Sequence, residues 1–157
     1  MNSAYDDRDG FIWMDGKLVN WRSAKVHILT HAMHYGSSVF EGERAYGGKI
    51  FKSLEHSKRL VKSGDFMDIP NPYSIDEIEA AKAKILEKSG LKDAYVRPIV
   101  WRGSGEDMGV ASAKNKVHMA IAVWSWGAYY GDAKEKGAVL DISKWKRPSP
   151  ETIPCFA

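Results

Sequence analysis

Residues 11–19, Phe-Ile-Trp-Met-Asp-Gly-Lys-Leu-Val, predict the first supersecondary unit of the fold. Two short runs of aliphatic and aromatic residues flank Asp15-Gly16, and a two-residue Asp-Gly connection is typical of a tight β-hairpin turn. The segment from Val39 to Tyr46 repeats this pattern, because it meets Lys49-Ile50-Phe51 across Gly47-Gly48. The first part of the chain is therefore expected to form antiparallel strands.

Two helices are expected after these strands. Ser53 is placed to cap a helix that runs to about Met67. Ser74 and Glu77 have the spacing of a capping box, and the helix that they begin should end at Gly90. The expected inward residues are Leu60, Val61 and Met67 in the first helix and Ile78, Ala81, Ile85 and Leu86 in the second.

Two longer strands should follow the helices, from Ala94 to Trp101 and from Val117 to Trp124, because both segments are rich in β-branched and aromatic residues. A linker from Gly127 to Gly137 and another strand from Val139 to Trp145 come next. An order of hairpins, then helices, then strands indicates an α+β fold rather than a doubly wound parallel sheet.

The composition is that of a globular domain and excludes several classes of protein. The 157 residues carry 23 Lys and Arg against 20 Asp and Glu, and this net charge of +3 is too small to indicate a nucleic-acid partner. No apolar run approaches the ~20 residues of a membrane span, and Met1 to Gly10 do not resemble a signal peptide. Cys155 is the only cysteine, so no disulfide can form within these residues and a cytoplasmic setting is expected.

Three histidines, His27, His31 and His34, lie close together in the sequence. Because His27 and His31 are four positions apart, they can share a helix face and bind zinc. No His-Glu-x-x-His pattern or neighbouring cysteine accompanies them. Hydrogen-bonded turns beside a sheet are therefore the favoured interpretation, and no metal is expected.

The glycine-rich residues 102–109 have a superficial likeness to a phosphate-binding loop. Met108 stands where the dinucleotide pattern needs its third glycine, and no Lys-Ser/Thr pair follows. A flexible loop over a pocket is the better interpretation of this segment.

Tyr95 and Arg97 form the most informative pair. On a strand they point to the same face, about 6.5–7 Å apart, where a phenol and a guanidinium can jointly bind a carboxylate. Pro98 has no N–H to donate, which places the strand at a sheet edge or next to a bulge. A solvent-facing polar stripe is the alternative.

Seven stretches together carry a family resemblance: Ala24-Lys25-Val26-His27, His31 to Arg44, Glu55-His56-Ser57-Lys58-Arg59-Leu60, Ala94 to Pro98, Met108-Gly109-Val110, Trp126-Gly127-Ala128-Tyr129 and Thr152-Ile153-Pro154. In order and spacing they resemble the branched-chain amino acid aminotransferases, within the fold-type IV (class IV) pyridoxal-phosphate-dependent enzymes. The resemblance runs from about Phe11 to Ala157 and implies the N-terminal half of such an enzyme.

The resemblance implies roles for individual residues. Arg59 corresponds to the ligand of the cofactor phosphate, and Arg97 to the residue that receives the side-chain carboxylate of glutamate. The implied pocket wall comprises Phe40, Tyr95, Trp126 and Tyr129, with Tyr95 also near the substrate α-carboxylate. The implied contributions to the neighbouring subunit's site are Tyr35 and the loop Met108-Gly109-Val110.

Two further positions bear on the substrate. The combination of Gly42 with the Tyr-x-Arg motif at Tyr95 and the Met-Gly-Val motif at Met108 resembles the pattern of the branched-chain group of the family. Glu43 stands where an aliphatic residue is common, and a changed pocket entrance is expected from it.

The resemblance also implies a cofactor, a reaction and an assembly. Pyridoxal 5'-phosphate would carry the amino group between L-leucine, isoleucine or valine and 2-oxoglutarate, in branched-chain amino acid biosynthesis, within a homodimer or a higher homo-oligomer. The Schiff-base lysine is expected immediately after Ala157, so no catalytic residue is nominated within 1–157. The expected domains are a small one over 1–126, an interdomain loop over 127–137, and the truncated start of the large cofactor-binding domain over 138–157.

Two other functions are compatible with the sequence. One is another fold-type IV enzyme, namely a D-amino-acid or (R)-amine transaminase or an aminodeoxychorismate lyase. The other is a non-enzymatic ligand-binding module, if the natural chain ends at Ala157.

Overall fold

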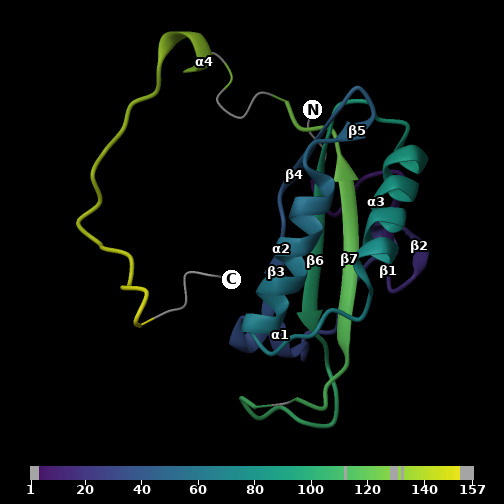
Figure 1. The fold of residues 1–157 in the computed structure, drawn as a ribbon, viewed down its shortest axis with the longest axis vertical. Helices are drawn as coiled ribbons and strands as arrows, with labels where there is room; N and C mark the ends of the chain where they lie inside the picture. The colour runs from purple at the N-terminus through teal and green to yellow at the C-terminus, as the bar shows by residue number, and fades with distance from the viewer. Residues whose placement is uncertain (1–3, 112, 128–130, 132, 153–157) are drawn as a thin grey trace.

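The computed structural model of the chain describes residues 4–111, 113–127, 131 and 133–152. Its elements are β1 (Phe11–Met14), β2 (Lys17–Asn20), the 3-10 helix η1 (Trp21–Ser23), α1 (His31–Tyr35), β3 (Ser38–Phe40), β4 (Glu43–Tyr46), β5 (Lys49–Ile50), α2 (Ser53–Phe66), α3 (Ile75–Ser89), β6 (Ala94–Arg102), β7 (Val117–Trp124) and α4 (Ala133–Lys136). The strands form one antiparallel sheet in the order β2-β1-β7-β6-β4-β5, with β3 also paired to β6. Figure 1 shows α2 and α3 lying across one face of this sheet. The expected α+β architecture is confirmed.

Both predicted hairpins are present. Asp15 and Gly16 have φ angles of 47° and 85°, and Gly47 and Gly48 have φ angles of 56° and 80°, as a primed two-residue turn requires. The segment from Val39 to Tyr46 is not one strand, however. It breaks at Glu41-Gly42 into β3 and β4, which pair with different parts of β6.

This break lies opposite Pro98. The expectation of a sheet edge or a bulge was wrong, because β6 lies in the middle of the sheet, with β7 on one side and β3 and β4 on the other, and neither β3 nor β4 has an extra residue opposite Pro98. The carbonyl of Pro98 accepts a hydrogen bond from the backbone N–H of Glu41 at 3.0 Å. The register that β3 and β4 share with β6 puts Glu41 opposite Pro98, so the missing N–H of Pro98 removes one ladder hydrogen bond where the two short strands are separated.

The helices follow their predicted boundaries closely. Ser74 and Glu77 form the capping box at the start of α3, and Gly90 ends α3 in the left-handed conformation. For α2, Ser53 is the first helical residue rather than the cap, which is Lys52 with a φ of 55°. The expectation that Met67 points inward was wrong, because Met67 is exposed and its place in the core is taken by Ile69.

Alternation along β6 separates the core from the other face of the sheet. Ala94, Val96, Pro98 and Val100 are buried beneath the two helices. Tyr95 and Arg97 point away from the helices, as expected from the period of a strand. No helix of the described residues is long and apolar enough to cross a membrane.

The expected strand from Val139 to Trp145 is absent. After Trp126 the described chain contains α4 and turns, and Figure 1 shows this segment running away from the sheet. Its apolar side chains are almost fully exposed: Val139, Leu140, Ile142 and Trp145. A strand needs a neighbour for its backbone hydrogen bonds, and none of the described segments pairs with this one.

Candidate functional site

Tyr95 and Arg97 lie together on the open face of the sheet. Arg97 Nη2 donates a hydrogen bond to the Tyr95 hydroxyl at 2.8 Å. The guanidinium carbon lies 4.3 Å from the centroid of the Phe40 ring and 5.1 Å from that of Tyr95. Arg97 Nε is buried, and it has no hydrogen-bond partner among the described residues. The pair is thus preorganised between aromatic rings and keeps donors available for an anionic group.

An aromatic wall continues from this pair. The Tyr95 ring centroid lies 4.5 Å from that of Trp126 and 4.9 Å from that of Trp124. Arg44 Nη1 fixes the backbone here by donating to the carbonyl of Trp126 at 2.9 Å. Trp124 was not among the residues nominated from the sequence. On β7 it lies directly opposite Tyr95, and it shares a face of the sheet with Ala122, two residues earlier on the same strand.

The close approach of Gly42 to Tyr95 completes this part of the site. The Tyr95 hydroxyl occupies the space that a β-carbon on Gly42 would need. Glycine at this position therefore sets where the hydroxyl lies and, through it, the orientation of Arg97.

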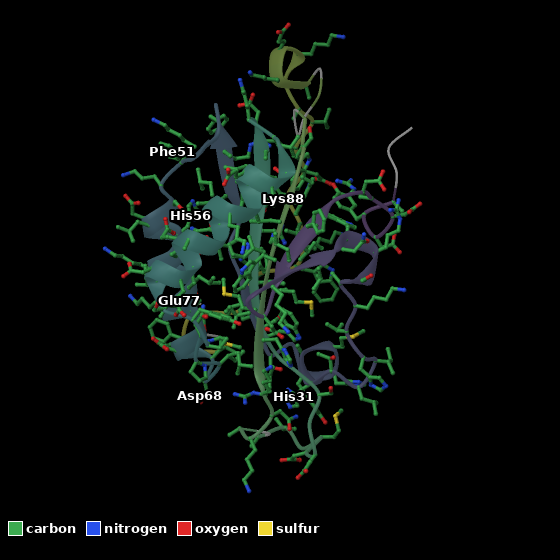
Figure 2. The ribbon with its side chains drawn as sticks, turned by 90° about the vertical axis from the view of Figure 1, so that its right-hand side faces the viewer. His31, Phe51, His56, Asp68, Glu77 and Lys88 are labelled. Carbon is green, nitrogen blue, oxygen red and sulfur yellow. The ribbon has the colours of Figure 1, made fainter. Side chains whose placement is uncertain are left out.

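Arg59 lies on α2 and joins the site through the break between β3 and β4. Its Nε and Nη2 donate to Oε1 and Oε2 of Glu41, each at 2.5 Å, and Glu41 directly follows Phe40. His56, which Figure 2 shows on α2, lies with Nδ1 2.7 Å from Glu41 Oε2. Burial alone raises the pKa of Glu41, but the hydrogen bonds from Arg59 and His56 outweigh it and lower the pKa below 4.5.

A second group forms where α1 meets the loop after β6. The Tyr35 hydroxyl donates to the carbonyl of Met108 at 2.9 Å. His31 is buried, with Nε2 3.1 Å from the carbonyl of Gly109. Val110, next in the loop, is exposed. The structure thus brings Tyr35 together with the loop Met108 to Val110, as the resemblance implied.

The two groups lie at opposite ends of β6. Tyr95 is next to the first residue of this strand, and Arg102, its last residue, leads into the loop that carries Met108. Seven steps of ~3.4 Å give roughly 24 Å between Tyr95 and Arg102. Figure 2 shows His31 and Phe51, which mark the two ends, far apart along the sheet. One chain therefore does not bring all its predicted site residues to a single ligand.

A pocket of about 360 Å³ opens on the bare face of the sheet. Among the described residues that line it, Arg97 is the one that carries a charge. Its apolar lining includes Met14, Val26, Met33, Ile99 and Ala120. Such a surface suits an aliphatic group next to a single charge-binding point. This pocket was not foreseen, because its lining comes from segments far apart in the sequence.

Glu43 differs from its expected position. It was expected to alter the pocket entrance, but it points into the helical layer, where Lys82 Nζ lies 2.9 Å from its Oε2. Lys82 also reaches Glu79 Oε1 at 2.8 Å. Burial raises the pKa of Glu43, and Lys82 opposes this effect. The pair belongs to the core.

The histidines are engaged in local hydrogen bonds. His27 Nδ1 accepts from the N–H of Leu29 at 3.1 Å, and His34 Nε2 lies 3.0 Å from the carbonyl of Ile28. Among the residues that the structure describes, no group of His, Cys, Asp or Glu could hold a metal ion. Tyr129, expected in the pocket wall, lies outside the described residues.

A family model described as amino-transferase class IV matches residues 38–154. A branched-chain-amino-acid aminotransferase of Pseudomonas aeruginosa is 47% identical over 146 residues. That match covers 90% of this chain and 47% of the relative, so the chain spans about half the relative's length.

Two solved structures have the same fold as this chain. The branched-chain amino acid aminotransferase from Escherichia coli has a TM-score of 0.83 and 37% identity, covering 94% of this chain and 48% of that one. The T.th. branched-chain amino acid aminotransferase with pyridoxamine 5'-phosphate has a TM-score of 0.86 and 38% identity, covering 94% and 50%.

Proposed function

This chain belongs to the amino-transferase class IV family, and from that premise we propose that the protein exchanges an amino group between branched-chain L-amino acids and 2-oxoglutarate with pyridoxal 5'-phosphate. The names of its relatives support this reaction. The structural observation that carries the proposal is the placing of Arg97, held between Phe40 and Tyr95, on an otherwise apolar open face.

This arrangement serves two unlike substrates. Leucine, isoleucine and valine need an apolar surface, which Phe40, Trp126 and the pocket lining can supply. Glutamate and 2-oxoglutarate bring a side-chain carboxylate, whose charge must be paired when it leaves water. Arg97 offers donors for that charge, and the Tyr95 hydroxyl, which accepts from Arg97, can donate its own proton to a carboxylate oxygen.

Arg59 is the residue that would hold the cofactor phosphate. Its Nε and Nη2 donate to Glu41, whereas no described residue accepts a hydrogen bond from Nη1, and 63% of its side chain is exposed. A guanidinium with an available edge fits a phosphate group. When bound, the cofactor supplies the electron sink and the amino-group carrier that side chains lack.

The remaining parts of the proposal concern sequence organisation. The reaction needs a lysine that links to the cofactor and moves the substrate α-proton, and we propose that this lysine follows Ala157, as the resemblance implies. Residues 1–126 would form the small domain, 127–137 the interdomain loop and 138–157 the beginning of the large cofactor-binding domain. A cytoplasmic setting accords with the single cysteine.

A homodimer is the proposed minimum assembly. This assembly is supported by the distance between two groups of site residues. Tyr35 and Met108 lie far from Tyr95 and Trp126 of the same chain, and they would complete the site of the partner subunit. Exposed apolar side chains surround the Tyr35 end: Val26, Ile28, Leu29, Met33 and Val110. Apolar surface of this kind is typical of an interface.

A substrate screen of the full-length protein tests the function. L-leucine, L-isoleucine and L-valine should each convert the cofactor to its amine form, and 2-oxoglutarate should restore the aldehyde form, both followed by absorbance. D-alanine, (R)-amines and aminodeoxychorismate should react far more slowly. Preference for any of these three would assign another activity of the same fold, and binding without turnover would indicate a ligand-binding module.

A further inference from the structure

The contact between Glu41 and Arg59 has a defined geometry. The Glu41 carboxylate binds the side-on edge of the guanidinium, which consists of Nε and Nη2. Nε donates to Oε1 and Nη2 to Oε2, each at 2.5 Å. The Glu41 side chain is 5% exposed, whereas that of Arg59 is 63% exposed. A buried carboxylate thus holds the inner edge of an otherwise exposed arginine.

Glu41 is itself fixed from two directions. Its backbone N–H donates to the carbonyl of Pro98 at 3.0 Å, which ties it to the central strand. His56, one helical turn before Arg59, lies with Nδ1 2.7 Å from Oε2. An ionised carboxylate only accepts hydrogen bonds, so His56 donates to it. The carboxylate is therefore a fixed anchor for the arginine.

The second edge of the Arg59 guanidinium remains for a ligand. A side-on contact uses one hydrogen of Nε and one of Nη2, and Nη2 also lies 3.2 Å from Nδ1 of His56. Both Nη1 hydrogens and the outer Nη2 hydrogen lie on the other edge of the guanidinium. No described residue accepts a hydrogen bond from Nη1 of Arg59. These donors form the end-on edge, whose spacing matches two oxygens of a phosphate.

We propose that Glu41 is a positioning residue that fixes Arg59, so that the end-on edge of the guanidinium is presented to the phosphate of the cofactor. This inference rests on the proposed function, because it requires that Arg59 binds a phosphorylated cofactor. Arginine loses rotamer freedom when it is held in one geometry, and an anchor present before binding removes that loss from the binding step. His56 supports the anchor by holding Oε2.

Glu41 also places a negative charge near the proposed phosphate. If charge were its dominant effect, removing it would strengthen phosphate binding. If positioning dominates, removal weakens binding. The two effects have opposite signs, so a single neutral substitution separates them.

The test compares pyridoxal 5'-phosphate with pyridoxal, which lacks the phosphate. Cofactor-free full-length protein is titrated with each compound by absorbance. In Glu41→Gln, affinity for pyridoxal 5'-phosphate should fall about 2- to 12-fold, while affinity for pyridoxal should stay within about twofold. Unchanged or increased affinity for the phosphorylated form would overturn the proposal, as would an equal loss for both compounds.

Two further variants complete the design. Glu43→Gln is a matched control, since Glu43 is a buried glutamate two residues along that pairs with Lys82, and it should leave the ratio of the two affinities unchanged. Arg59→Lys keeps the charge but removes the fork, so adding Glu41→Gln to it should have little further effect on the ratio. A full additional loss would show that Glu41 acts independently of Arg59 and would overturn the proposal.

The proposed function can fail separately from this inference. If Arg59→Lys leaves the preference for the phosphorylated compound intact, Arg59 is not the phosphate ligand, and the premise fails. If Arg59→Lys reduces the preference but Glu41→Gln does not, the phosphate site stands and the positioning role is wrong.

Discussion

The hydroxyl of Tyr95 fills the space beside the α-carbon of Gly42, so closely that a methyl group on Gly42 would collide with it. The same hydroxyl accepts the hydrogen bond from Arg97. One oxygen atom thus couples Tyr95 and Arg97 on β6 with Gly42, which lies in the break between β3 and β4. The absence of a side chain at Gly42 is part of the site.

Gly42→Ala should displace the Tyr95 ring and break its hydrogen bond with Arg97. A hydrogen bond to a charged group contributes about 1.5–3 kcal/mol, so kcat/KM for 2-oxoglutarate should fall roughly 10- to 150-fold. Steady-state kinetics measure this loss. Gly127→Ala is the control, because no atom of the described residues, apart from its chain neighbours, lies within 4 Å of the added carbon. Full activity in Gly42→Ala would show that the position of the Tyr95 hydroxyl does not matter.

Arg97→Met should separate the two half-reactions. The 2-oxoglutarate half-reaction should lose on the order of 2–4 kcal/mol in kcat/KM, because a carboxylate would be left unpaired. The leucine half-reaction should lose less than ~1 kcal/mol, since methionine keeps the bulk of the side chain. Single-turnover absorbance of the cofactor measures each half-reaction. Equal losses would assign Arg97 to the common α-carboxylate or to the architecture of β6.

Mixed dimers should reveal whether Tyr35 acts across the interface. In a dimer of one Arg59→Ala subunit and one Tyr35→Ala subunit, a trans arrangement places both lesions in one site and leaves the other site intact. Random mixing should then restore about a quarter of the wild-type sites, since about half of the dimers are mixed. Activity after co-refolding measures the restoration. No gain over the two parent variants would place Tyr35 in its own subunit's site.

Lys82→Met should destabilise the fold strongly. It leaves Glu43 buried without its cation, at a cost of about 3–5 kcal/mol in the free energy of unfolding. Adding Glu43→Leu should recover most of this loss, because well-packed apolar residues commonly replace a buried ion pair without cost. Urea denaturation measures both variants. Failure of the second substitution to recover stability would mean that Glu79 or packing, rather than Glu43, causes the loss.

Acid should weaken the anchor of Arg59. The folded-state pKa of Glu41 lies below 4.5, so its ionised form contributes stability that is complete above pH 4.5 and lost as the pH falls through the lower folded value. Glu41→Gln should lack this component, which makes its unfolding free energy less dependent on pH below about 4.5. Denaturation at several pH values compares the two proteins, and identical pH profiles would contradict the assignment.

Local signals in the sequence predicted the elements well. The Asp15-Gly16 turn and the Ser74-Glu77 capping box depend on neighbouring residues only, and both are present. Strand alternation correctly put Tyr95 and Arg97 on one face.

Contacts between distant residues could not be predicted in this way. Glu41 and Arg59 are 18 positions apart, and Glu43 and Lys82 are 39 apart, so no local pattern marks either pair. The break opposite Pro98 was missed for a related reason, because it depends on which residues of β3 and β4 pair with β6.

The two faces of β6 have different consequences for engineering. Substitutions at Val96 or Val100 disturb packing beneath the helices, and they should reduce protein yield before they alter selectivity. The intervening positions Tyr95, Arg97 and Ile99 face away from that core. A mutant library restricted to these alternate positions should therefore explore new substrates while most of its members still fold.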